Sequence, residues 1–216
     1  MRCIVTAGPT CEPLDDVRRL TNVSTGRLGS ELANFLVARG HQVTLLIGQQ
    51  AAYHGEQHAQ YAETFTTTAS LRDCLHTLAG KPVDAVFHAA AVSDFAFGKI
   101  WRRSPSGELL EIKSRKFATR QGALLAELAP TPKIIAELRG WFPPARLVGW
   151  KYEVDGDRAG VVRVAAQQLA ECLTNACVAN GPAYGDGFGL VTGPDRCAHL
   201  PHADALFEAL DRLMRE

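Results

Sequence analysis

Hydrophobic positions along the chain alternate between short continuous runs and runs at helical spacing. The continuous runs predict buried strands at 2–7, 42–47, 83–89, 146–151 and 176–180. Between them, helical spacing predicts a helix from about residue 24 to Gly40, and others at 69–79, 132–139, 158–174 and 202–215. This alternation is typical of an α/β fold, in which a parallel sheet is covered by helices on both faces.

Residues 96–130 break the alternation. Two short strands are predicted there, at 107–113 and 121–128, as a hairpin or arm, and the basic run Lys113-Ser114-Arg115-Lys116 lies in it. An arm of roughly 30 residues cannot bury a core of its own, so it is expected to pack on the parent domain or on a partner subunit. We therefore expect a single domain, 1–216, interrupted by an arm at about 96–130.

Composition narrows the function classes. The 23 Lys and Arg residues balance the 23 Asp and Glu residues, so overall charge does not favour nucleic-acid or membrane binding. Six cysteines without C-x-x-C spacing are typical of reduced thiols. No signal peptide precedes the first strand, and no apolar run approaches membrane-spanning length. The protein is expected to be cytoplasmic.

Three loops rich in small residues are expected to meet at one edge of the sheet. Ligands of such sheets bind at the carboxyl ends of the strands, and small residues let backbone amides approach a ligand closely. The three loops are Ala7-Gly8-Pro9-Thr10, Ala89-Ala90-Ala91-Val92-Ser93-Asp94 and Val148-Gly149-Trp150-Lys151.

A fourth loop, 22–29, runs into the first helix. The free N–H groups and dipole of that helix make an anion site, to which the hydroxyls of Ser24 and Thr25 add donors. Simple capping by the same hydroxyls fits equally well. The first turn lacks G-x-G-x-x-G, and no acidic residue ends the second strand, which disfavours an NAD-dependent dehydrogenase. A Walker A motif is missing, and no protein metal site is expected.

One long stretch carries a motif with fixed spacing. Residues 6–29, TAGPTCEPLDDVRRLTNVSTGRLG, resemble the signature T-A-G-G-T-x-E-P-I-D-x-V-R-x-I-x-N-x-S-S-G-x-M-G of the phosphopantothenate–cysteine ligases. The segments 89–94, 147–153 and 178–180 are similar to later motifs of that family. The resemblance covers residues 3 to 190 or so, in the family's order.

The resemblance implies a Rossmann-like fold with a protruding β-arm for dimerisation, and hence a homodimer. It implies a ligase of coenzyme A biosynthesis that joins 4'-phosphopantothenate to cysteine through an acyl-nucleotide intermediate. CTP or ATP is the implied co-substrate, with Mg²⁺. Because the chain starts at the ligase strand, no FMN is expected, and a separate phosphopantothenoylcysteine decarboxylase is a candidate partner.

The resemblance also implies roles for single residues. Asn22 is expected to contact the acyl-nucleotide carbonyl, and Arg18 suits a phosphate or the ordering of its loop. Lys116 best matches the family's lysine at the base of the arm, with Lys113 and Lys99 as rivals. The residues expected to bind nucleotide are Gly8, Thr10, Ser24, Thr25, Gly26, Ala89, Ala90, Ala91, Asp94, Pro132, Lys133, Ile134, Ile135, Trp150 and Lys151.

Three positions depart from the family pattern. CTP-dependent bacterial members carry two lysines where this chain has Gln168 and Cys172, and Pro9 replaces a glycine that would supply an N–H donor. ATP-type members also lack the lysine pair and have a lysine matching Lys151. CTP and ATP both stay open, with ATP favoured. The departures also keep an alternative open, a non-catalytic or repurposed nucleotide-binding relative.

Overall fold

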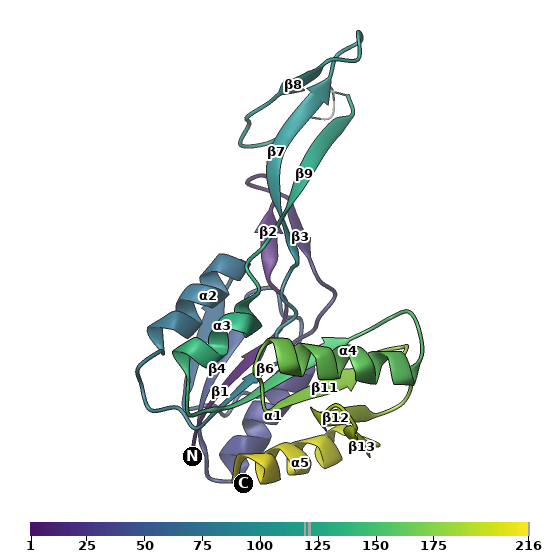
Figure 1. The fold of residues 1–216 in the computed structure, drawn as a ribbon. Helices are drawn as coiled ribbons and strands as arrows, with labels where there is room; N and C mark the ends of the chain where they lie inside the picture. The colour runs from purple at the N-terminus through teal and green to yellow at the C-terminus, as the bar shows by residue number, and fades with distance from the viewer. Residues whose placement is uncertain (119, 121, 216) are drawn as a thin grey trace.

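The main sheet of this computed structural model, which describes residues 1–118, 120 and 122–215, contains eight strands. They are β1 (Arg2–Ala7), β4 (Gln42–Gly48), β5 (Tyr61–Phe65), β6 (Ala85–His88), β10 (Arg146–Tyr152), β11 (Ala176–Asn180), β12 (Phe188–Gly193) and β13 (Arg196–Leu200). Their order is β13-β12-β11-β10-β6-β1-β4-β5 (Figure 1). The five predicted strands are all present, and they pair in parallel with their neighbours among them.

Helices cover both faces of this sheet, as predicted. They are α1 (Arg27–Ala38), α2 (Thr68–Thr77), α3 (Ile134–Trp141), α4 (Arg158–Glu171) and α5 (Ala203–Arg215). One core cluster packs α1 and α5 against side chains such as Val5 and Val178. The opposite side chains of the same strands, such as Ile4, pack under α2 and α3, and α4 packs over Cys177 and Ala179. Burial on both faces explains why the central strands are continuously apolar.

The sheet is mixed rather than wholly parallel, and three of its strands were not predicted. Strand β12 pairs antiparallel with β11 and with β13, and β5 pairs parallel with β4 at the other edge. Most residues of β5 and β13 are exposed, so these edge strands lack the apolar pattern that identifies a buried strand.

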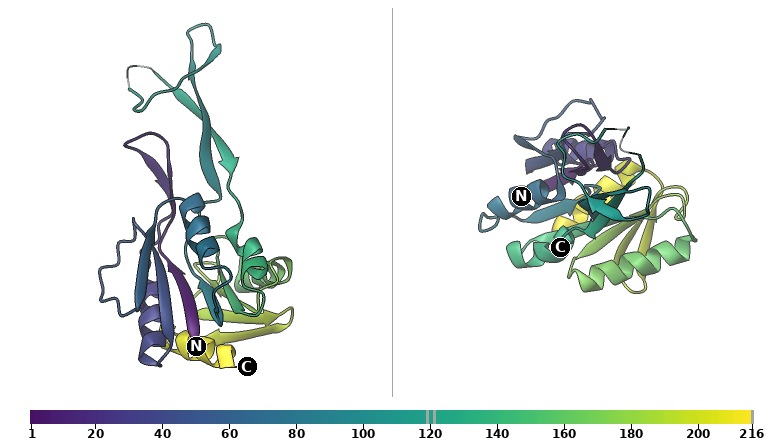
Figure 2. Two further views of the ribbon diagram at one scale, coloured as in Figure 1. Left: turned by 90° about the vertical axis from the view of Figure 1, so that its left-hand side faces the viewer. Right: turned by 90° about the horizontal axis from the view of Figure 1, so that it is seen from above.

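The arm rises from the carboxyl edge of the sheet, at the end of the molecule opposite the two termini (Figures 1 and 2). It consists of β7 (Phe95–Arg103), β8 (Leu109–Glu111) and β9 (Leu124–Pro130), in the order β8-β7-β9. The predicted hairpin of 107–113 with 121–128 is therefore wrong in its pairing: both segments flank β7, which was not predicted, and residue 121 lies outside the described residues. A register shift between Phe97 and Ile100 interrupts the alternation of β7 and conceals it in the sequence.

The loop predicted between residue 8 and the first helix contains a short hairpin. Strands β2 (Cys11–Pro13) and β3 (Arg19–Thr21) pair antiparallel beside the base of the arm (Figure 1). Among the described residues, none of the helices combines the length and apolarity that a membrane span requires.

Candidate functional site

The loops that follow β1 and β6 are bonded to each other, as the sheet topology predicts. The Ala91 N–H donates to the Gly8 carbonyl (2.9 Å), and the Thr10 N–H donates to the Ala91 carbonyl (3.1 Å). Pro9 pairs with Ala91 in a parallel β-bridge. The hydrogen bonds of this bridge use the carbonyl of Gly8 and the N–H of Thr10, the residues on either side of Pro9. The missing N–H of Pro9 is therefore not needed for joining the two loops.

Thr10 connects these loops from within. It is fully buried, and its Oγ1 accepts hydrogen bonds from the Ser93 N–H (2.8 Å) and from the Thr68 hydroxyl (3.3 Å). Its carbonyl accepts from the Thr21 hydroxyl (2.9 Å). The side chain of Thr10, predicted as a nucleotide ligand, is thus used to hold three loops together.

A second buried pair lies below the Ala89–Ala91 turn. The Thr6 hydroxyl and His88 Nδ1 are hydrogen bonded at 3.0 Å, and the Ala90 N–H donates to the same hydroxyl (3.0 Å). Burial lowers the pKa of His88 to about 4, so the imidazole is neutral at pH 7. These two side chains fix the backbone of the turn without adding charge to it.

Asn22 lies beside this turn. Its Nδ2 donates to the Ala91 carbonyl (3.1 Å), which joins the motif at 6–29 to the motif at 89–94. An amide nitrogen carries two hydrogens, so one donor of Asn22 remains for a ligand. The side chain is exposed, as a residue that contacts a substrate must be.

The start of α1 offers backbone donors. Its N-cap is Gly26, which makes no side-chain cap, and its first turn contains no acidic residue. Thr25 Oγ1 accepts only a long hydrogen bond from the Arg27 N–H (3.3 Å), while Ser24 is half-buried and makes no cap. The capping explanation is therefore weak, and the uncapped helix start suits an anion.

Gly8 and Gly26 make this close approach possible. Both have φ of +78°, and a Cβ on Gly26 would lie 3.2 Å from Gly8 Cα. The two backbones are thus packed directly against each other, which only glycine allows at this φ.

The turn before α3 and the start of that helix combine exposed and buried residues. Pro132 and Lys133 are exposed, and Lys133 is the N-cap of α3 without a side-chain cap. The side chains of Ile134 and Ile135 are buried in the core under α2 and α3. Ile134 and Ile135 were predicted to bind nucleotide, but they can offer a ligand only their backbone.

Trp150 and Lys151 lie near the carboxyl end of β10, at the same edge. Lys151 Nζ lies 3.2 Å from Glu153, and Lys133 Nζ lies 3.9 Å from Glu171, so both cations have acidic neighbours. Two buried polar atoms, Trp150 Nε1 and Asn180 Oδ1, have no hydrogen-bond partner among the described residues. Both atoms are buried, so neither is exposed to a ligand in this structure.

Gln168 and Cys172 lie in the interior of the protein. The Gln168 amide donates to the Trp150 carbonyl (3.3 Å), and Cys172 is 2% exposed. The two positions at which the family resemblance predicts lysines in CTP-dependent members are therefore filled by a neutral amide and by an apolar core contact.

The three candidate arm lysines differ in their surroundings. The Nζ atoms of Lys99 and Lys113 lie 3.5 Å and 4.0 Å from the carboxylate of Glu111 on β8. Lys116 is exposed, makes no ion pair with the described residues, and is next to Phe117, whose backbone contacts Arg18 and Asp15. Of the three lysines, Lys116 lies in the segment bound to the first motif.

Among the described residues, no three His, Cys, Asp or Glu side chains gather as a metal site, although Asp94 is exposed at the carboxyl edge. A Mg²⁺ ion at this edge would take most of its ligands from phosphate oxygens and water.

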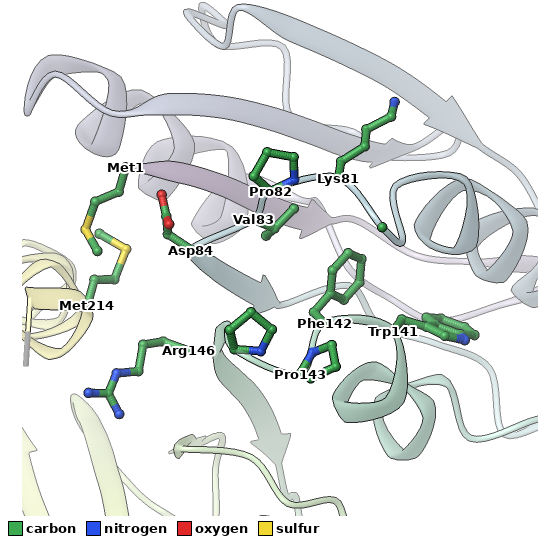
Figure 3. A pocket seen from close by; sticks show the side chains of 12 residues that line it. Met1, Lys81, Pro82, Val83, Asp84, Trp141, Phe142, Pro143, Arg146 and Met214 are labelled. Carbon is green, nitrogen blue, oxygen red and sulfur yellow. The ribbon is translucent and has the colours of Figure 1, made fainter.

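A hollow of about 560 Å³ lies at the opposite edge of the sheet, where the strands begin. Figure 3 shows the Met1, Asp84, Arg146 and Phe142 side chains around it. None of the predicted site residues lines this hollow. Its position is therefore separate from that of the bonded loops.

Several residues of the site were missed by the sequence analysis. Thr6, His88, Ser93 and Thr21 hold the loops from below, and Thr131 joins them by donating its hydroxyl to the Ser93 carbonyl (2.5 Å). Thr6 and His88 could have been found, because each is a polar residue near the end of a buried strand.

Comparison with known proteins gives a family match and several relatives. The chain matches the model of the DNA/pantothenate metabolism flavoprotein C-terminal domain over residues 1–194. It is 30% identical to the coenzyme A biosynthesis bifunctional protein CoaBC of Thermococcus kodakarensis over 222 residues, covering 99% of this chain and 51% of that protein. The chain thus spans about half the length of this relative.

Solved structures share the fold. The DNA/pantothenate metabolism flavoprotein from Streptococcus pneumoniae superposes with a TM-score of 0.85 at 24% identity, over 100% of this chain and 98% of that chain. A Cab2 variant in complex with phosphopantothenate-cysteine has a TM-score of 0.71 at 19% identity, over 99% of this chain and 86% of that chain.

Proposed function

The chain belongs to the family of the DNA/pantothenate metabolism flavoprotein C-terminal domain, and from this membership we propose that it joins 4'-phosphopantothenate to the amine of cysteine. The observation that carries the proposal is the hydrogen bond from Asn22 Nδ2 to the Ala91 carbonyl. It brings together two family motifs that lie 69 residues apart, at the edge where such sheets bind ligands.

The proposed reaction has two steps. The phosphopantothenate carboxylate attacks the α-phosphorus of CTP or ATP, and pyrophosphate leaves. The cysteine amine then attacks the acyl carbonyl, CMP or AMP leaves, and the amine loses a proton. Splitting the reaction in this way turns an unreactive carboxylate into an electrophile.

Residues of the carboxyl edge suit these steps. The uncapped start of α1 and the small residues Gly8 and Ala89 would bind phosphates through backbone N–H groups. The free donor of Asn22 would stabilise negative charge on the acyl oxygen. Lys116, with Lys133 and Lys151, would neutralise the triphosphate.

Mg²⁺ would accompany the nucleotide, held mainly by its phosphates, and would lower the charge repulsion at the α-phosphorus. The proposal assigns no FMN to this chain. A homodimer and a decarboxylase partner that consumes the product are also part of the proposal, and the bifunctional nature of the curated relatives supports the decarboxylase.

A pyrophosphate-release assay tests the proposal. Release should require phosphopantothenate and either CTP or ATP, and formation of phosphopantothenoylcysteine should require cysteine as well. Nucleotide binding without pyrophosphate release under any of these conditions would instead support a repurposed, non-catalytic relative, for which the uncharged Gln168 and Cys172 are the structural argument.

A further inference from the structure

The turn between β2 and β3 is bonded to the backbone on both sides of Lys116. The Phe117 N–H donates to Asp15 Oδ2 (3.2 Å), and Arg18 Nη2 donates to the Phe117 carbonyl (2.6 Å). The Asp16 N–H donates to the Arg115 carbonyl (2.9 Å). Phe117 itself is buried, with 4% of its surface exposed. A segment of the arm is therefore fixed to a turn about one hundred residues earlier.

Asp15 is central to this contact. Its side chain has no exposed surface, and its Oδ1 accepts hydrogen bonds from the Val17 N–H (3.0 Å) and the Arg18 N–H (2.8 Å). Burial raises the pKa of the Asp15 carboxyl, but hydrogen bonds from the N–H groups of Val17, Phe117 and Arg18 outweigh it and leave the pKa below its usual value. One oxygen thus orders the turn, while the other binds the arm segment.

Arg18 acts on the same segment. Its guanidinium lies 3.6 Å from Asp15 Oδ2 and donates to the Phe117 carbonyl, so it spans the contact. A planar guanidinium can make both interactions at once. This assignment differs from direct phosphate binding, because the group donates to the chain's own backbone.

We infer that Asp15 and Arg18 are positioning residues that hold the backbone around Lys116 at the base of the arm. The inference rests on the proposed function, in which Lys116 reaches the triphosphate. An exposed lysine on an unattached segment would lose conformational entropy when it binds the triphosphate. Because Asp15 and Arg18 already hold the backbone of this segment, less entropy is lost on binding.

Limited trypsin digestion tests the contact without any assumption about the reaction. In Asp15→Asn the retained Oδ1 still accepts from Val17 and Arg18, but an amide nitrogen faces the Phe117 N–H and cannot accept from it. Cleavage after Arg115 and Lys116 should become about tenfold faster. Loss of a hydrogen bond to a charged group raises the population of the locally opened segment, which trypsin cuts, by about that factor. Cleavage after Arg39 is the internal reference.

Asp16→Asn is the matched control. It makes the same change of charge in the same turn, but the Asp16 carboxylate forms only an exposed ion pair with Arg115, with 94% and 54% of the Arg115 and Asp16 side chains exposed. Its digestion should match that of the native protein. Arg18→Lys keeps the positive charge but loses the planar guanidinium that makes both contacts, so it should be digested as fast as Asp15→Asn. It serves as the test variant if Asp15→Asn does not fold.

The link to Lys116 is tested by a double-mutant cycle in the pyrophosphate assay. Asp15→Asn should lower kcat about tenfold in the native background and have no further effect when Lys116 is already alanine. Equal digestion of native and Asp15→Asn proteins overturns the contact. Faster digestion with additive kinetic effects overturns the positioning role. If no variant of the series has ligase activity, including the native protein, the proposed function fails, and the inference that depends on it falls with it.

Discussion

Thr6 and His88 lie near the carboxyl ends of neighbouring parallel strands, and their side chains are hydrogen bonded at 3.0 Å directly below the Ala89–Ala91 turn. The same Thr6 hydroxyl accepts from the Ala90 N–H. Because burial lowers the pKa of His88 to about 4, the folded protein binds no proton at this ring between pH 7 and about pH 5.

Stability should therefore depend on His88 in mild acid. The unfolded chain binds a proton at this ring near pH 6.5 and the folded protein does not, so acid favours unfolding. Between pH 7 and pH 5 the native protein should lose about 2 kcal/mol more unfolding free energy than His88→Gln. Urea unfolding at the two pH values measures the difference. The exposed His54→Gln variant should follow the native protein, and equal losses in all three would contradict the prediction.

Asn22→Ala should spare folding and impair turnover. The side chain is exposed, and loss of a donor to developing charge costs roughly 3–4 kcal/mol of transition-state stabilisation. Steady-state kinetics with phosphopantothenate measure kcat, and a denaturant midpoint checks the fold. The fully exposed neighbour Val23 provides the control, Val23→Ala. Native turnover in Asn22→Ala would remove Asn22 from the mechanism.

Gly26→Ala should destabilise the protein more than Gly40→Ala does. Both glycines have positive φ, so each alanine pays roughly 1–2 kcal/mol for a left-handed conformation. A Cβ on Gly40 meets nothing within 4 Å, whereas one on Gly26 would lie 3.2 Å from Gly8 Cα and 3.1 Å from the Ala51 Cβ. The difference in unfolding free energy between the two variants, measured by urea unfolding, gives the cost of the steric contact at Gly26. Equal losses of unfolding free energy would show that the loop after β1 can move aside.

The protein should not strictly prefer CTP over ATP as its nucleotide. Gln168 is bonded to the Trp150 carbonyl and Cys172 is buried, so neither supplies a cation to the nucleotide. We expect kcat/KM for ATP to equal or exceed that for CTP. Competition between the two nucleotides in one pyrophosphate assay gives the ratio directly, and a large preference for CTP would refute the expectation.

The arm should form a homodimer contact. Leu109 and Leu128 are 47% and 50% exposed on β8 and β9, and a short arm that exposes leucines is stabilised by burying them against a second copy. Sedimentation should give a dimer at micromolar concentration, and Leu109→Glu with Leu128→Glu should give a monomer of reduced activity. Val164→Glu, at an exposed valine on α4, is the control. A native monomer with full activity would end this prediction.

The sequence by itself determined the central strands, because burial on both faces requires continuous apolar runs such as those of β1 and β10. It also determined that Gly8 and Ala91 lie at one edge, since carboxyl ends of parallel strands meet there. Edge strands β5 and β13 escaped prediction, because exposed side chains carry no such pattern.

Only the tertiary structure decided how single side chains are used. Ile135 was predicted to bind nucleotide, yet its side chain on α3 is buried in the core, and Thr10 is engaged by Ser93 and Thr68. The bond between Asp15 and Phe117 joins residues 102 positions apart, and its existence depends on where the arm leaves the sheet. Local patterns fix which face of an element is apolar, but the partner of a polar atom is fixed by the path of the whole chain.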